Sequence, residues 1–160
     1  EAVLTVLNRG LGGGLDPTLA LSLAAGFPDG LGGRGCLCGA VSRGVMALGL
    51  FLRPPSLRPL ARPHGARDAA GRLHDAFRVR FGSTCCRVLT RGLDPGSPAH
   101  LRHCAEVTGG AAEETARLLW SLRPGLAEQV DRDYLECRES RLAAGWKRLT
   151  DACPLGRAAG

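Results

Sequence analysis

Residues 26–50, GFPDGLGGRGCLCGAVSRGVMALGL, join a glycine-rich loop to an apolar helix. The glycines of residues 28–35, PDGLGGRG, permit positive φ angles and a close approach of other chain segments. Two cysteines, Cys36 and Cys38, follow directly, in the first turn of a helix predicted over about residues 36–52. We therefore expect the rest of the chain to be arranged around this helix start.

The composition favours helices over sheets. Hydrophobic residues make up 44% of the 160 residues and aromatic residues only 4%, so the core must consist mainly of leucine, alanine and valine. This length suits one well-packed domain with at most an appendage. The apolar run at residues 36–52 is interrupted by Arg43 and three glycines, so we interpret it as a buried helix and not as a membrane span.

Start and stop signals divide the chain into about six helices, with no strand and no repeat. Apolar spacing predicts a first helix over residues 1–9, and Asp16 followed by Pro17 starts a second helix that we expect to be mostly buried. The later helices are predicted over about residues 66–81, 104–122 and 125–152, and a proline-rich connector over residues 53–63. The predicted fold class is all-α, a compact helical bundle with the glycine-rich loop before the central cysteine-bearing helix.

The positive charge of the chain has two explanations. The net charge is +6 and the isoelectric point is about 9.3, which fits a nucleic-acid-binding module. However, the sequence has no run of basic residues, and arginines alternate with acidic residues along most predicted helices. We therefore do not expect nucleic acid as a partner.

Seven cysteines in a chain without secretory character indicate metal or redox chemistry. Five of them lie at predicted helix starts, where unpaired backbone N–H groups favour thiolate. These are Cys36 and Cys38, then Cys85 and Cys86 after the cap signal FGST, and Cys104 at the head of the helix 104–122. Three helix starts directed at one centre would make the donor-rich pocket that a thiolate–metal cluster needs.

Other interpretations of the cysteines remain open. Cys85 and Cys86 could close a vicinal disulfide, although we favour metal binding by one and packing by the other. Cys137 and Cys153 lack neighbouring cysteines and are best explained by core packing or free thiols. The paired Cys-x-x-Cys knuckles of a structural zinc site are missing, and so are the signatures of c-type haem attachment and of common hydrolases.

Taken in order, several segments resemble the family of redox-active proteins named from its cysteine pattern, C-GCAxxG-C-C. They are EAVL at residues 1–4, LAAGF at 23–27, CGAVSRGVMALGL at 38–50, FGSTCCRVL at 81–89, and Cys104. The family is similar to the iron–sulfur part of split-Soret cytochrome c. The resemblance implies an all-helical fold that holds an iron–sulfur cluster on the patterned cysteines, within a redox domain at residues 1–119. Residues 120–160 lie beyond the resemblance, and we expect them to form a C-terminal helical extension.

Carried over by position, the resemblance assigns the metal ligands to Cys38, Cys86 (or its neighbour Cys85) and Cys104. The chain departs from the pattern at Ala40, where the motif has its own cysteine. The family's first cysteine is expected about two residues before Glu1. Cys36 or that upstream thiol would therefore be the fourth ligand.

We therefore expect an iron–sulfur protein of electron transfer, with a separate redox protein as its partner. A homodimer formed through residues 120–160 is left open, as is enzymatic activity. The alternative is a thiol–disulfide oxidoreductase or redox sensor that uses pairs among Cys36, Cys38, Cys85 and Cys86. No secretory signal is visible, and we expect a cytoplasmic protein without membrane contact.

Overall fold

The computed structural model describes residues 2–53 and 64–136, and within these ranges the chain contains no strand. The elements are α1 (Ala2–Gly10), α2 (Pro17–Ala24), α3 (Pro28–Leu31), α4 (Gly39–Phe51), α5 (His64–Phe81), α6 (Cys86–Leu89), α7 (Pro98–Leu122) and the 3-10 helix η1 (Pro124–Gln129). The prediction of an all-α fold is confirmed. The predicted helices at residues 1–9 and 66–81 agree with α1 and α5 to within two residues.

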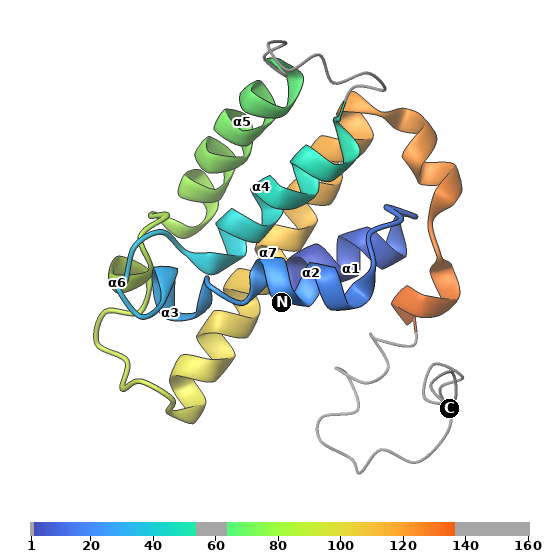
Figure 1. Cartoon of the computed structure of the whole chain (residues 1–160). Coiled ribbons are helices and arrows are strands. Elements are labelled where there is room, and N and C mark those ends of the chain that lie inside the picture. Colours follow the sequence, from blue (N-terminus) through green and yellow to red (C-terminus); the bar gives the residue numbers. More distant parts are fainter. Residues whose placement is uncertain (1, 54–63, 137–160) are drawn as a thin grey trace, which may run out of the picture.

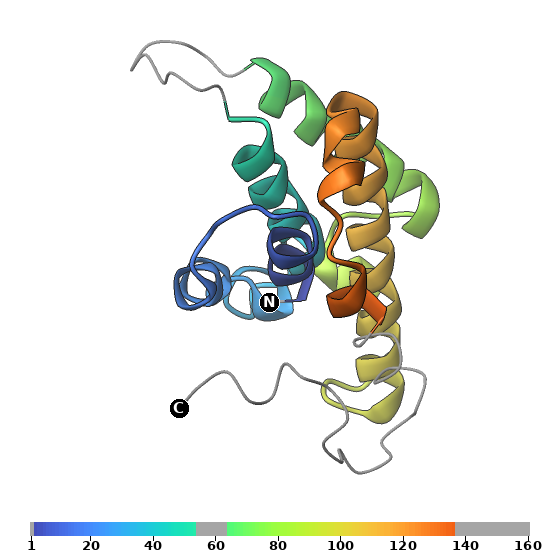
Figure 2. The same cartoon turned by 90° about the vertical axis from the view of Figure 1, so that its right-hand side faces the viewer.

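Helix α4 lies at the centre of the bundle and contacts α1, α5 and α7 (Figure 1). Figure 2 shows the packing from the side, with α7 running along the full height of the bundle. The core consists mainly of leucine, alanine and valine, as the composition predicts, together with a few phenylalanines. On α5, Ala69, Leu73 and Phe77 are fully buried against this core, and Phe81, which continues the same stripe, is partly buried.

Two helices start at a side-chain cap followed by proline. Asp16 Oδ1 accepts a hydrogen bond from Leu19 N at 2.9 Å and starts α2, as predicted. Ser97 Oγ accepts from His100 N at 3.1 Å, so α7 begins at Pro98 and not at Cys104. The prediction that Cys104 heads its helix is therefore wrong, because the cap signal Ser97-Pro98 lies six residues upstream.

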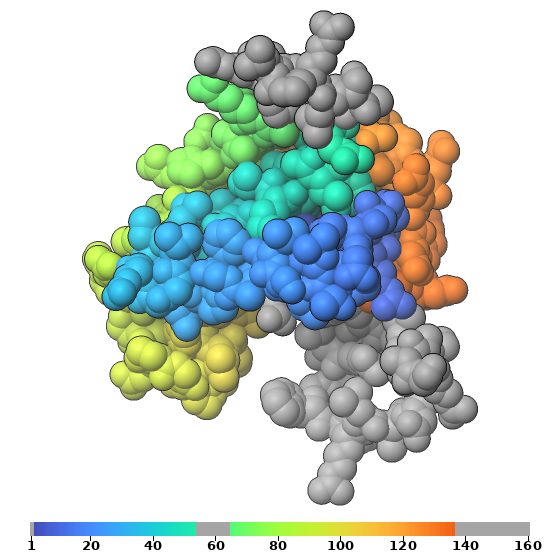
Figure 3. Space-filling model, in the orientation of Figure 1, coloured from blue at the N-terminus to red at the C-terminus, as the bar shows by residue number. Residues whose placement is uncertain are grey.

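Helix α2 is less buried than predicted. Leu19, Leu21 and Leu23 are 48%, 42% and 49% exposed, and only two alanines of the helix are buried. The physical reason is its position, because α2 packs chiefly against α1, at the outer face of the molecule (Figure 3). A run of leucines therefore does not by itself indicate a core helix.

The predicted last helix is wrong at its start. Residues 124–129 form the 3-10 helix η1, and Asp131 N then donates to Gly10 O at 3.0 Å, which turns the chain back toward α1. Tyr134 is buried there. Residues 132–136 are helical, as predicted. The remainder of the predicted helix, with Cys137, Trp146 and Cys153, lies outside the described residues, as does the connector at residues 54–63. No helix in the described part is long and apolar enough to cross a membrane.

Gly44 allows α4 to approach two helices at once. A Cβ atom at this position would lie 2.6 Å from Thr115 Oγ1 on α7 and 2.8 Å from Leu73 Cδ2 on α5. Both contacts are too short for real atoms, and Thr115 is fixed by its own hydrogen bond to Ala111 O. The central packing therefore requires a glycine here.

We predict that Gly44→Ala lowers the free energy of unfolding by about 1–3 kcal/mol, because the added methyl group overpacks the core. The matched control is Gly49→Ala in the same helix, where a Cβ would meet nothing within 4 Å. This control should stabilise the protein by up to about 1 kcal/mol through helix propensity. Urea unfolding of both variants measures the difference, and equal effects would contradict the packing argument.

Candidate functional site

The first cysteine of the site, Cys38, is buried at the start of α4. It is the N-cap residue of the helix, and its side chain makes no cap hydrogen bond. Its backbone N–H donates to Thr84 O at 2.7 Å, which ties the start of α4 to the segment before α6. Its carbonyl accepts from Ser42 N and Ser42 Oγ. The backbone on both sides of the Cys38 thiol is therefore fixed.

The glycine-rich loop packs directly against α6, whose first residue is Cys86. A Cβ at Gly30 would lie 2.8 Å from Cys86 Cβ and 2.7 Å from Cys36 N, and Gly30 has φ +72°. Gly35 O accepts from Arg87 N at 3.0 Å. The loop is thus held on α6 by backbone contacts that only glycine at position 30 permits.

The third cysteine, Cys104, lies on α7 and is partly buried. It is more than one turn inside the helix, so the free N–H groups of the α7 N-terminus do not surround it. The helix-start argument accordingly applies to Cys38 and Cys86 but not to Cys104. Helix α7 packs against α4, and the negative charge of Cys38, at the start of α4, acts on the Cys104 thiol.

Electrostatic coupling shows that these cysteines lie near one another. The pKa of the Cys86 thiol is raised to about 11, chiefly by burial and then by the nearby thiols of Cys38 and Cys104, by Asp29 and by Cys85. Burial, Cys38 and Asp29 likewise raise the pKa of Cys104. Because such interactions fall off with distance, Cys38, Cys86 and Cys104 form one group, which we call the three-cysteine group.

The direction of these pKa shifts is opposite to the one expected from helix N-termini. The free N–H groups of a first turn favour thiolate, but here burial and neighbouring negative charge favour the neutral thiol of Cys86 and Cys104. The sequence shows the helix starts but not how the fold buries the sulfur atoms or which charges it brings near them. Burial and neighbouring negative charge therefore act against the thiolate form of both residues.

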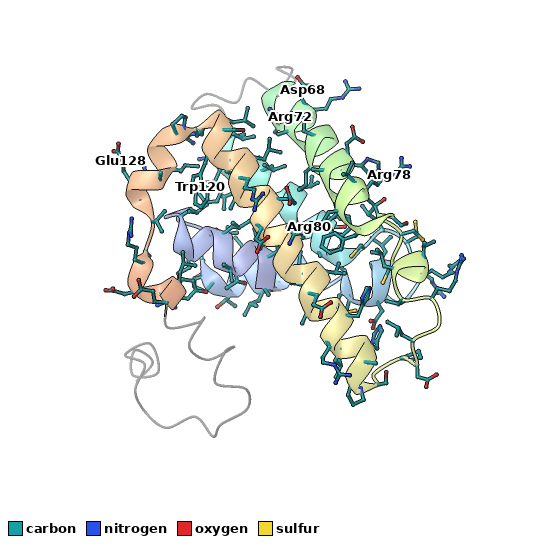
Figure 4. All side chains as sticks on the ribbon, turned by 180° about the vertical axis from the view of Figure 1, so that it is seen from behind. Asp68, Arg72, Arg78, Arg80, Trp120 and Glu128 are labelled. Atoms are coloured by element: carbon teal, nitrogen blue, oxygen red, sulfur yellow. The ribbon has the colours of Figure 1, made fainter. Side chains whose placement is uncertain are left out.

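The other two described candidates lie at the edge of the site. Cys36 is exposed, and it does not contribute to either raised pKa. The Cys85 thiol donates a hydrogen bond to Gly35 O, in the glycine-rich loop, at 3.1 Å. All five described cysteines are free thiols. Figure 4 shows sulfur atoms at the end of the bundle where α6 lies.

Two histidines beside Cys104 were not predicted as site residues. His100 Nε2 lies 3.7 Å from Cys104 Sγ, and His100 Nδ1 accepts from Gly96 N at 3.2 Å. His103 Nε2 is buried and has no hydrogen-bond partner among the described atoms. The spacing of four between His100 and Cys104 would have revealed the first contact, had the helix start at Ser97-Pro98 been recognised.

The described part of the chain holds no preformed metal site. Within residues 2–53 and 64–136, no group of three or more Cys, His, Asp or Glu side chains has the geometry to hold a metal ion. The three-cysteine group is thus a convergence of thiols and not a set of ligands already at bonding distance.

Comparison with known proteins identifies the family. Residues 1–118 match the family described as "Putative redox-active protein (C_GCAxxG_C_C)". The chain belongs to this family. No curated protein and no solved structure matches the sequence. The match includes all three members of the three-cysteine group and ends inside α7. Membership of the C_GCAxxG_C_C family supports a redox role for the protein.

We predict that Cys86 of the reduced, metal-free protein is alkylated slowly by iodoacetamide near neutral pH and that its rate rises up to about pH 11, because only thiolate reacts. In urea, the profile should shift toward the ordinary thiol pKa of about 8.5. Mass spectrometry of the alkylated peptides measures each cysteine separately. Identical pH profiles in the folded and unfolded states would contradict the buried, charge-coupled site.

We further predict that Gly30→Ala disrupts the packing of the loop on α6. The matched control is Gly33→Ala, because Gly33 also has positive φ, at +81°, but a Cβ there would meet nothing within 4 Å. Gly33→Ala should lower the free energy of unfolding by about 1–2 kcal/mol, because alanine adopts a positive φ only at a conformational cost. Gly30→Ala should lower the free energy of unfolding further and accelerate Cys86 alkylation near neutral pH. If both variants behave alike, the close approach at Gly30 is not required.

Proposed function

We propose that this protein transfers electrons through an iron–sulfur cluster held by Cys38, Cys86 and Cys104. The observation that carries the proposal is the convergence of three thiols from α4, α6 and α7, which lie far apart in the sequence. Cysteine thiolates are the usual ligands of such clusters. Membership of a redox-active family supports the same chemistry.

The electrostatics of the three-cysteine group favour a bound cation over free thiolates. Three thiolates in one partly buried pocket would repel one another and lose hydration, which is why the pKa of Cys86 and Cys104 is raised. A bound metal cation offsets both costs, since a coordinating thiol is deprotonated outright. The arrangement is unfavourable for bare thiolates and suited to metal-bound ones.

The backbone at the start of α4 adds donors to the site. The first hydrogen bond within the helix runs from Ser42 N to Cys38 O, so the N–H groups of residues 39–41 precede it. Because Cys38 is the N-cap, these groups follow it in the first turn of α4, where free N–H groups favour negative charge on thiolate or sulfide. This is the contribution that we propose for the glycine-rich helix start.

Asp29 is a candidate for a further ligand. Its carboxylate is the one non-cysteine group that raises the pKa of both Cys86 and Cys104. It lies in the glycine-rich loop at φ +53°, a conformation that a residue other than glycine adopts at a cost. Asp29 and Cys36 are both exposed, and Asp29 is thus a second candidate, beside Cys36, for the role of fourth ligand.

An iron–sulfur cluster supplies one-electron oxidation and reduction, and the protein supplies binding and a partly dry environment. No acid, base or nucleophile is needed for such a role. We propose a separate redox protein as the partner, and a reducing compartment such as the cytoplasm as the setting that keeps the free thiols reduced.

The alternative function, thiol–disulfide exchange, has one observation in its favour. Cys85 donates to the carbonyl of Gly35, the residue before Cys36, so these two cysteines lie on adjoining segments at the edge of the site. Two thiols could there lose two electrons and two protons to an external disulfide. Pairs that include Cys86 are disfavoured, because its raised pKa makes it a weak nucleophile at neutral pH.

We predict that anaerobically purified full-length protein contains iron and sulfide and absorbs visible light. Cys38→Ser, Cys86→Ser and Cys104→Ser should each lose most of the iron, because each removes a proposed ligand. Cys85→Ser is the matched control, since Cys85 adjoins Cys86 but bonds to Gly35 O, and it should keep the iron. Colourless, iron-free protein from the anaerobic preparation, or equal iron loss in the Cys85 and Cys86 variants, would overturn the proposal.

A further inference from the structure

We infer that His100 donates a hydrogen bond from Nε2–H to Cys104 Sγ and is a positioning residue of the site, not a metal ligand. The donation itself is independent of any bound metal. Its effect on the reduction potential rests on the proposed iron–sulfur function. The inference begins from the geometry of the first two turns of α7.

The start of α7 fixes the position of His100. Ser97 Oγ accepts from His100 N at 3.1 Å, which makes His100 the third residue of the helix. Cys104 follows four residues later, so the two side chains lie one turn apart on the same face. His100 Nε2 and Cys104 Sγ are 3.7 Å apart, which suits a hydrogen bond to the large sulfur atom.

The second ring nitrogen of His100 decides which tautomer is present. Gly96 N lies 3.2 Å from His100 Nδ1, and a backbone N–H can only donate. Nδ1 must therefore be the acceptor and carry no proton. In the neutral ring the proton is then on Nε2, and it faces Cys104 Sγ. Gly96 has φ +75°, so glycine is favoured in the turn that orients this donor.

The same contact argues against His100 as a ligand. A neutral histidine that binds metal through Nε2 carries its proton on Nδ1, where it usually donates to a carbonyl or carboxylate. Here Nδ1 faces the N–H of Gly96, and two protons would oppose each other. Ligation would require the turn at Gly96 to change, whereas donation to Cys104 requires no change.

A donated hydrogen bond alters the redox properties of a sulfur ligand. It withdraws negative charge from the thiolate and so stabilises the more negative, reduced state of whatever the sulfur binds. His100 should therefore raise the reduction potential of a cluster ligated by Cys104. The other ligand sulfurs, Cys38 and Cys86, have no contact with His100 in the structure's hydrogen bonds.

The tautomer can be measured without iron. We would label the histidines of the full chain with ¹⁵N and record ring spectra of the reduced metal-free and zinc-loaded protein at mildly alkaline pH. The chain has four histidines, so the signal lost in His100→Gln assigns the ring. We expect proton occupancy on Nε2 in both samples. A proton on Nδ1 would overturn the inference.

The effect on potential is tested with two variants of the iron-loaded protein. His100→Phe removes the donor, and His100→Gln keeps an amide N–H near the position of Nε2. We expect the potential of His100→Phe to become more negative, the potential of His100→Gln to stay close to that of the native protein, and both variants to keep their iron. Loss of iron in both variants would identify His100 as a ligand, and an unchanged potential in both would show a purely structural role. If the native protein binds no iron, the proposed function fails and the tautomer measurement alone decides this inference.

Discussion

The hydrogen bond from Cys38 N to Thr84 O joins two parts of the chain that the helices bring together from a distance. It connects the loop before α4, which carries Cys36 and Cys38, with the turn before α6, where Cys85 and Cys86 follow Thr84 directly. The bond can form because α4 and α5 pack side by side in opposite directions, so the start of α4 and the end of α5 lie at the same side of the bundle (Figure 1). The three-cysteine group is therefore a product of helix packing and not of a local motif.

Because the site depends on helix packing, it also depends on the glycines that let the helices and the loop approach one another closely. Gly44 brings α4 against both α5 and α7, and Gly30 brings the loop against α6. At the first residue of α4, Gly39 admits the backbone of Phe27, whose carbonyl oxygen a Cβ would approach at 2.5 Å. Arg80 of α5 then joins α7 through Glu113 and Glu114 at 2.7 and 2.9 Å, in an exposed position (Figure 4). Such exposed ion pairs contribute little, so the packing at glycines matters more for the site.

The sequence alone predicted the structure correctly where the signal lies in a few neighbouring residues or in the composition. Asp16-Pro17 marks the start of α2, the stripe at Ala69, Leu73 and Phe77 marks α5, and the low aromatic content predicts a helical core. It was insufficient where the outcome depends on tertiary neighbours. Burial of α2 depends on which helices cover it, and the thiol pKa values depend on charges that only the fold brings near. The choice of Cys38, Cys86 and Cys104 as ligands remains a prediction, supported by their convergence.

Helix α7 contains both site residues and core residues, and the helix is continuous between them. Cys104 follows His100 by one turn, and the buried residues Val107, Ala111, Thr115 and Leu119 continue at spacings of three and four. One inserted or deleted residue rotates everything beyond it by about 100°. Between His100 and Leu119, such a length change would turn either the sulfur away from its partners or the apolar face away from α4. We therefore expect relatives of this chain to vary in length at the turn before Ser97 or beyond Leu122, and to keep the number of residues between these points constant.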